Sequence, residues 1–140
     1  MWKIYTDGAY SSSRDAGGLS VVFVKDDKVV QTFNKMFSHV TNNKMELAAV
    51  IYALKTVLKN NLQNVTIYTD SQYVIGCATK GWKRKKNIQL WYRYDLIKQE
   101  LDSKKITINY EWVHGHNGDK FNELADKLAV EASQELDLKF

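Results

Sequence analysis

In the N-terminal third of the chain, hydrophobic and polar positions follow the short period of β-strands. Residues 2–6, 17–25 and 29–38 are rich in β-branched and aromatic side chains. The first run stops before Asp7 and a glycine, which predicts that the strand ends in a loop there. The break at residues 26–28 is a short polar turn typical of an antiparallel hairpin. We therefore expect a three-stranded meander at the start of the fold.

The period changes to that of a helix over residues 43–60. Apolar side chains recur there at spacings of three and four, and further aliphatic residues extend the apolar surface around much of the cylinder. This pattern predicts a largely buried helix. Asn43 followed by Glu46 has the spacing of an N-cap and its capping-box partner, which predicts that the helix begins at Asn43.

The rest of the chain alternates strands and helices. We expect a strand at 65–69, a weak helix from 71 to about 79, a helix at 88–101, a strand at 105–113 and a helix at 122–136. The order β-β-β-α-β-α-α-β-α is that of an α/β protein. Two right-handed crossovers would build the parallel half of a mixed five-stranded sheet with helices on both faces. At 140 residues, the chain suits a single domain over 1–140.

The composition indicates more about the location of the protein in the cell than about the reaction it could catalyse. The 20 Lys and Arg residues against 16 Asp and Glu residues give a net charge of +4, which suits a polyanionic partner without requiring one. Cys77 is the only cysteine, so no intramolecular disulfide can form and we expect a cytoplasmic location. No apolar run approaches the ~18 residues of a membrane span, and no signal-peptide pattern is present. We expect a soluble monomer.

Two carboxylates follow strands in the same local pattern. Asp7 directly follows the run 2–6, and Asp70 directly follows the run 65–69. In open α/β sheets, ligands bind outside the carboxyl ends of strands near a switch in strand order. If the two strands are neighbours, Asp7 and Asp70 converge at such a point. The alternative is that each Asp only forms a turn or an N-cap.

Two further acidic residues lie on predicted helices. Glu46 stands on a helix too apolar to leave much solvated face, although the capping box gives it an ordinary role. Asp126 lies on the margin of the core-facing side of the last helix, next to Lys127, where a surface position is equally ordinary. The pattern alone leaves both alternatives open.

A shared site for these carboxylates would need cations. Four carboxylates without paired arginines repel one another and are driven towards protonation. Mg²⁺ prefers oxygen ligands and keeps several waters, so an acidic site open to solvent suits it. Two ions ~4 Å apart would stabilise both the attacking water and the leaving oxygen in phosphodiester hydrolysis. Zinc suits the chain less, because only His114 and His116 show ligand-type spacing.

Six short segments together make the sequence similar to one known family. They read YTDGA at 5–9, GG at 17–18, TNNKMEL at 41–47, YTDSQYV at 68–74, WVHGH at 112–116 and NELADKLA at 122–129. Each segment alone is unremarkable, but all of them in this order on the expected elements are specific. The chain resembles the type 1 ribonuclease H (RNase H) family over essentially its whole length, in a form with a shortened basic protrusion.

The resemblance implies the RNase H-like fold and an enzyme that hydrolyses the RNA strand of RNA–DNA hybrids, leaving 5′-phosphate and 3′-hydroxyl ends. It implies that two Mg²⁺ ions act with the substrate, with Mn²⁺ as a possible substitute. His116 matches a histidine on the loop before the last helix, which assists proton transfer or the release of product and metal. The implied metal-binding catalytic carboxylates are Asp7, Glu46, Asp70 and Asp126.

The same resemblance implies a set of polar side chains that contact the substrate. Amide groups both donate and accept hydrogen bonds, which suits the 2′-hydroxyl that separates RNA from DNA. The loop at 10–16 departs from the glycine- and proline-rich version of the family. The matching residues are Thr41 and Asn43 for the backbone, Asn42 and Asn122 near the RNA strand, Gln72 for the minor groove, and Ser13 on the loop at 10–16.

A second departure lies between residues 73 and 91, where many relatives carry a long basic helix that grips the DNA strand. The short stretch here still interleaves cations with an indole, a combination that contacts phosphates and stacks on sugars or bases. The alternative is a solvated loop. We expect weaker and more salt-sensitive hybrid binding than in relatives with the longer form. The expected contact residues are Trp82, Lys83, Arg84, Lys85 and Lys86.

Two other functions are compatible with an acidic cluster on this fold. A DNA-cutting relative, such as an integrase or junction resolvase, would use similar carboxylates, but the segments 41–43 and 70–72 argue against it. A non-catalytic hybrid-binding module is disfavoured because all four carboxylates are present.

Overall fold

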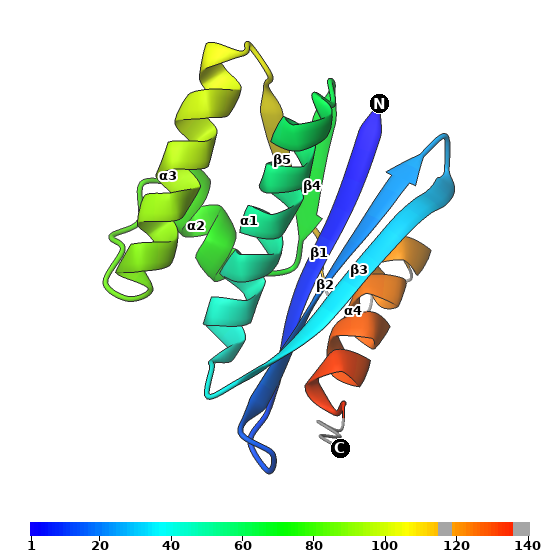
Figure 1. Ribbon diagram of the computed structural model, residues 1–140, viewed down its shortest axis with the longest axis vertical. Coiled ribbons are helices and arrows are strands. Elements are labelled where there is room, and N and C mark those ends of the chain that lie inside the picture. The colour runs from blue at the N-terminus through cyan, green and yellow to red at the C-terminus, as the bar shows by residue number, and fades with distance from the viewer. Residues whose placement is uncertain (115–118, 136–140) are drawn as a thin grey trace.

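The strands of the protein form one mixed sheet in the order β3-β2-β1-β4-β5 (Figure 1). The computed structural model describes residues 1–114 and 119–135. The strands are β1 (Trp2–Ser11), β2 (Ala16–Lys25), β3 (Lys28–Ser38), β4 (Val65–Thr69) and β5 (Ile108–Trp112), and the helices are α1 (Asn42–Asn60), α2 (Gln72–Thr79), α3 (Ile88–Ser103) and α4 (Lys120–Ser133). The predicted element order and the mixed five-stranded sheet are confirmed.

The antiparallel half of the sheet is the predicted meander of β1, β2 and β3. Asp26 and Asp27 form the turn between β2 and β3, with φ values of 53° and 59°. Positive φ at both central residues is the mark of a type I′ turn, which aspartate tolerates better than most residues. Lys25 pairs with Lys28 across the turn. The hairpin predicted at residues 26–28 is confirmed.

β1 is longer than the sequence pattern predicts. The expectation that it ends before Asp7 is wrong, because β2 supplies an antiparallel partner as far as Ser11, including the pair Asp7–Ser20. On its other side, β1 pairs in parallel with β4 only as far as Tyr5–Tyr68. β1 therefore continues past the end of β4, and the sheet has an opening beside Asp7.

Helices cover both faces of the sheet, as predicted. The helices α1, α2 and α3 lie on one face and α4 lies on the other (Figure 1). The main core joins α1 to the sheet, with Leu47 packed in the same buried cluster as Ile4 and Ile67. A smaller core on the α4 side contains Val22 and Ala125. Within the described ranges, no helix combines the length and the apolar character needed to cross a membrane.

The start of α1 differs from the prediction. Thr41 is the N-cap, and its side-chain oxygen accepts the backbone N–H of Lys44. Asn43 lies inside the first turn instead of capping it. Thr41, Asn42 and Asn43 are all residues that cap helices well, so the local sequence does not separate them.

Two other element ends also differ. β5 begins at Ile108 and not at residue 105, because Lys105 has a φ of 59° and the Ile106 N–H still bonds to α3 at the Leu101 carbonyl. α4 begins before Asn122, because the Asp119 side chain accepts the backbone N–H groups of residues 121 and 122. The predicted end of this helix at residue 136 lies outside the described residues.

Candidate active site

Asp7 and Asp70 lie at matching positions because their strands are parallel neighbours. Tyr5 pairs with Tyr68 in the β1–β4 register, and each Asp lies two residues further along its chain. Asp70 directly follows β4, as predicted, whereas Asp7 lies within β1. The structure thus brings the two carboxylates together at the opening beside β1.

Glu46 enters the same opening from α1. A Cβ at Gly8 would lie 2.5 Å from the Glu46 backbone nitrogen and 2.7 Å from the Met45 carbonyl carbon, so only glycine permits this close approach of helix and strand. The Gly8 N–H donates to the Glu46 carboxylate and, at 2.9 Å, to Asp7 Oδ1. The capping-box role of Glu46 is therefore wrong, because its side chain is bound to β1.

Asp126 approaches from the opposite face of the sheet on α4. It is half-buried on the margin of the helix face, where the sequence pattern places it. Its charge acts on both Asp7 and Asp70. One carboxylate oxygen from each of Asp7, Glu46 and Asp70 lies within 4.8 Å of the others. Three of the four predicted carboxylates therefore form a tight group, and the fourth stands beside it.

Burial and mutual repulsion raise the pKa values of the grouped carboxyls. Burial raises the pKa of Asp7 to about 7, and repulsion from Asp70 and Asp126 adds to this rise. Burial and the Asp7 charge raise the pKa of Glu46 well above its usual range, and burial raises the pKa of Asp70. Among the described residues, no lysine, arginine or histidine forms an ion pair with these groups. Full ionisation near neutral pH therefore needs a bound cation.

The donor set fits a hard divalent metal ion. Glu46 Oε2 is buried and has no hydrogen-bond partner in the described structure, a state that is unfavourable unless a ligand satisfies it. Carboxylate oxygens are the ligands that Mg²⁺ and Mn²⁺ prefer, whereas zinc favours nitrogen and sulfur. Asp7, Glu46 and Asp70 would hold the metal, with Asp126 at the side of the site.

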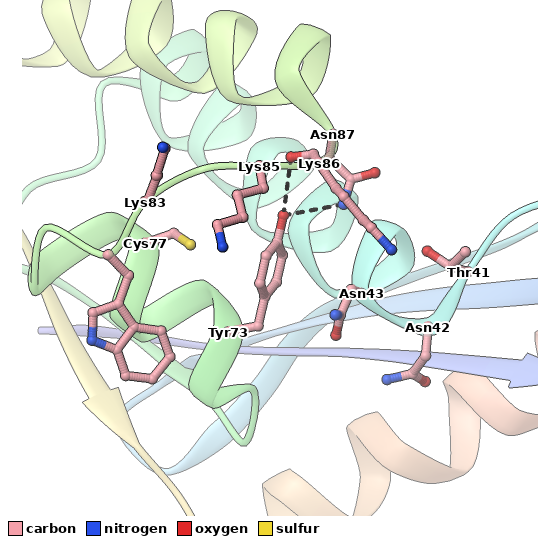
Figure 2. Close-up of a pocket in the computed structure, with 10 residues that line it drawn as sticks. Thr41, Asn42, Asn43, Tyr73, Cys77, Lys83, Lys85, Lys86 and Asn87 are labelled. Atoms are coloured by element: carbon pink, nitrogen blue, oxygen red, sulfur yellow. Dashed lines mark hydrogen bonds between the residues drawn. The ribbon is translucent and has the colours of Figure 1, made fainter.

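A groove of about 570 Å³ lies between the start of α1, α2 and the loop at 80–87 (Figure 2). It opens next to the acidic cluster, because Asn42 and Glu46 are one helical turn apart on α1. Two segments that the sequence analysis singled out separately, 41–43 and 82–86, therefore meet in one groove. The predicted substrate residues that line it are Thr41, Asn42, Asn43, Trp82, Lys83, Lys85 and Lys86.

Tyr73 and Asn87 shape this groove, and sequence reasoning did not assign them to the site. The Tyr73 hydroxyl accepts hydrogen bonds from Asn87 Nδ2 at 3.1 Å and Trp91 Nε1 at 2.9 Å. It donates to the Lys86 carbonyl at 3.5 Å, which ties α2 to the loop (Figure 2). The signal for Tyr73 was its place in the family-like segment 68–74. No sequence signal pointed to Asn87, because its positive φ of 58° cannot be recognised from the sequence.

Arg84 is turned into the protein and not into the groove. Its Nη1 donates to both carboxylate oxygens of Asp95, at 2.9 Å and 2.7 Å. Its guanidinium lies 4.2 Å from the centre of the Trp91 ring, and its other nitrogens donate to the Cys77 carbonyl. Among the loop residues predicted to contact substrate, Arg84 is therefore the one that does not line the groove, and its donors hold the loop against α2 and α3.

The structure also describes three of the other predicted site residues. Gln72 is exposed at the start of α2, and Ser13 is exposed on the loop between β1 and β2. Asn122 is buried in the first turn of α4, one turn before Asp126, and its Oδ1 has no hydrogen-bond partner in the described structure. His116 lies outside the described residues.

Comparison with known sequences gives this arrangement a family. The family model described as RNase H matches residues 1–134. The ribonuclease H of Trichodesmium erythraeum is 39% identical to the chain, and the alignment covers 96% of this chain and 90% of that protein. Both matches extend over all four carboxylates and both segments that line the groove.

Comparison with solved structures gives the same fold. The N-terminal RNase H domain of a Mycobacterium tuberculosis protein, solved as a fusion with maltose-binding protein, has a TM-score of 0.80 at 24% identity, covering 95% of this chain and 93% of that one. LC11-RNase H1, solved in complex with an RNA/DNA hybrid, has a TM-score of 0.78 at 21% identity, covering 96% and 97%. The sequence match over residues 1–134 and this shared fold confirm the resemblance, and the chain belongs to the RNase H family.

Proposed function

We propose that the protein is an endoribonuclease that hydrolyses the RNA strand of RNA–DNA hybrids and leaves 5′-phosphate and 3′-hydroxyl ends. The observation that carries this proposal is the buried group of Asp7, Glu46 and Asp70, with Asp126 beside it and no basic partner among the described residues. The name ribonuclease H, which relatives at 39% and 37% identity carry, supports the same activity.

The chemistry follows from this donor set. Two Mg²⁺ ions, or Mn²⁺ in their place, would bind with the substrate, stabilise negative charge on the phosphate and lower the pKa of water. The Gly8 N–H orients the carboxylates of Asp7 and Glu46 by donating to both. The orphaned Glu46 Oε2 is left available as a ligand. Asp126 adds negative charge from the α4 side.

The groove beside the carboxylates suits the DNA strand of an RNA–DNA hybrid. Lysine side chains of the loop at 80–87 would contact phosphates of the DNA strand, Thr41 and Asn43 would contact the substrate backbone, and Asn42 would lie near the RNA strand. By the family resemblance, Asn122 would lie near the RNA strand. LC11-RNase H1 was solved with an RNA/DNA hybrid, which supports this class of substrate.

Further roles belong to the same proposal. His116 would assist proton transfer or the release of product and metal. Gln72 would add a minor-groove contact, and Ser13 would add a further polar contact to the substrate. The protein would act as a monomer, because the grouped carboxylates and the groove all come from one chain. A cytoplasmic location is supported by the free, buried thiol of Cys77.

One incubation experiment tests the proposed activity. Labelled RNA–DNA hybrid, duplex DNA and duplex RNA are each incubated with the protein in Mg²⁺ or in EDTA, and the products are resolved on a gel. We expect cleavage of the RNA strand of the hybrid, in Mg²⁺ only. Cleavage of duplex DNA would instead indicate an integrase-like or resolvase-like enzyme, and retention of uncut hybrid would indicate a binding module.

Replacing Lys83, Lys85 and Lys86 together by alanine should weaken hybrid binding and leave the chemical step intact. A lysine that contacts a phosphate displaces counterions from the nucleic acid, and this release favours binding. Without the three lysines, KM should rise about 10-fold at moderate salt and should depend less steeply on the salt concentration. We expect kcat to stay within about twofold. Steady-state kinetics over a series of salt concentrations measure both. Arg84 is kept, because its bonds to Asp95 hold the loop.

A triple variant at Lys28, Lys59 and Lys104 is the matched control. These lysines are exposed and none of them lines the groove, yet their removal changes the net charge by the same amount. The control should leave KM within about twofold, because distant surface charges are screened at moderate salt. Equal increases of KM in both variants would mean that net charge, and not contact by the loop, controls binding.

A further inference from the structure

Ser20 is a buried hydroxyl in an otherwise apolar stretch of β2. It is 0% exposed, and Val21, Val22 and Phe23 follow it in the buried core. It pairs directly with Asp7 across the β1–β2 ladder. Directly paired residues project from the same face of a sheet, so Ser20 and Asp7 lie side by side on the face that carries α4.

The Ser20 hydroxyl is bonded to α4 next to a predicted metal ligand. Its Oγ donates to the backbone carbonyl of Ala125. That carbonyl belongs to the peptide unit that joins Ala125 to Asp126, so the hydroxyl holds the backbone directly before the Asp126 Cα. A helical carbonyl already accepts an N–H from the following turn. The Ser20 bond is therefore additional to the hydrogen bonds within α4, and it links β2 to α4.

A second contact fixes the same two elements in register. A Cβ at Gly18 would lie 2.2 Å from the Ala129 carbonyl oxygen, so β2 and α4 meet backbone to backbone at this point. Two strand residues, from 18 to 20, span about 7 Å. Four helical residues, from 129 to 125, span about 6 Å. The Gly18 and Ser20 contacts therefore match one turn of α4, and the Ser20 bond is the one nearer to Asp126.

We propose that Ser20 is a positioning residue that sets the place of Asp126 relative to Asp7, and thereby the affinity of the carboxylate site for divalent ions. Asp126 is the carboxylate that stands outside the tight group of Asp7, Glu46 and Asp70. Its distance from that group depends on where α4 lies along β2, which the hydroxyl fixes. The inference rests on the proposed metal-dependent function.

The test compares metal binding by Ser20→Ala, Asp126→Asn and the double variant. Calorimetric titration of the free proteins with Mg²⁺ and with Mn²⁺ gives the affinity without any cleavage. Mutation of a residue that orients a metal ligand typically lowers the metal affinity by 10-fold or more. We therefore expect Ser20→Ala to weaken metal binding about 10-fold. If Ser20 acts through Asp126, the same substitution should change affinity less than about twofold in the Asp126→Asn background.

Val57→Ala is the matched control for lost stability. Val57 is 0% exposed and belongs to the core on the α1 side of the sheet, not to the cluster that contains Ala125, and it lies about three helical turns from Glu46 along α1. It should lower the free energy of unfolding in urea at least as much as Ser20→Ala does. It should leave the metal affinity and the KM for hybrid unchanged.

Wild-type metal affinity in Ser20→Ala, or an equal loss of affinity in Val57→Ala, would overturn the proposal. A full 10-fold loss in the Asp126→Asn background would also overturn it, because Ser20 would then act without Asp126. Failure of the proposed function is distinguishable from these results. If the wild-type protein binds Mg²⁺ but cuts no hybrid, the calorimetric comparison still decides the role of Ser20.

Discussion

Replacing Asp7 by asparagine is expected to abolish cleavage of RNA–DNA hybrids and to leave the protein folded. The amide oxygen of asparagine can still accept the Gly8 N–H, which Asp7 Oδ1 accepts at 2.9 Å, so β1 has no reason to move. The substitution removes one charge from the group whose ligand atoms lie within 4.8 Å of one another. We expect kcat/KM in Mg²⁺ to fall on the order of 10³-fold or more, about 4 kcal/mol of transition-state stabilisation.

Asp27→Asn is the control for this substitution. Asp27 lies in the β2–β3 turn with a φ of 59°, a conformation that asparagine also tolerates, and it is exposed. It should cut hybrid at the wild-type rate. Asp70→Asn should be as inactive as Asp7→Asn, because the two residues occupy matching positions beyond the Tyr5–Tyr68 pair. Near-normal turnover by a folded Asp7→Asn or Asp70→Asn variant would show that the site assignment is wrong.

The sequence pattern places Asp70 correctly at the end of its strand but places Asp7 wrongly. β4 does end at the residue before Asp70, as its apolar run predicts. The Asp-Gly pair that seemed to end β1 lies inside it, because the partner strand β2 continues alongside. Pairing between strands is a property of the whole sheet, so a local turn signal does not reveal it.

The sequence pattern also leaves the role of Glu46 open, and only tertiary contacts decide it. Spacing from Asn43 fits a capping box equally well, and the N-cap is in fact Thr41. The deciding bond comes from the Gly8 N–H, 38 residues earlier in the chain. Family resemblance made Glu46 a candidate metal ligand, and the structure brings its carboxylate into one group with those of Asp7 and Asp70.

The basic loop at 80–87 is a third case in which tertiary contacts decide the role of a residue. A run of lysines and arginine predicts a cationic surface, but it does not show which side chains face outward. Arg84 differs from its neighbours because Asp95 and Trp91, on α3, offer it a carboxylate and an aromatic face. Ser20 is comparable, since its only distinguishing feature is a partner 105 residues away in the sequence.

In the absence of divalent ions, the free energy of unfolding is expected to fall as the pH rises from about 4 through about 7. Burial raises the pKa of Asp7 from 3.8 to about 7, so the folded protein binds this proton more tightly than the unfolded chain. A group of this kind stabilises the fold below its unfolded pKa, and that stability is lost as the pH rises through its folded pKa. At 1.36 kcal/mol for each pKa unit, a shift of this size corresponds to about 4 kcal/mol, which the interacting carboxyls of the site share. Urea unfolding in EDTA across this pH range measures the slope.

Mg²⁺ and Asp7→Asn provide the two controls for the pH dependence. Excess Mg²⁺ should flatten the slope, because an ion that binds the ionised carboxylates stabilises the folded state more strongly as those carboxyls lose their protons. Asp7→Asn in EDTA should also have a shallower slope, and it should be more stable than the wild type above about pH 7. Its remaining slope would come from Glu46 and Asp70, whose pKa values burial also raises. Equal slopes for both proteins in EDTA would mean that Asp7 is ionised without a cation, and the electrostatic argument for the metal site would then fail.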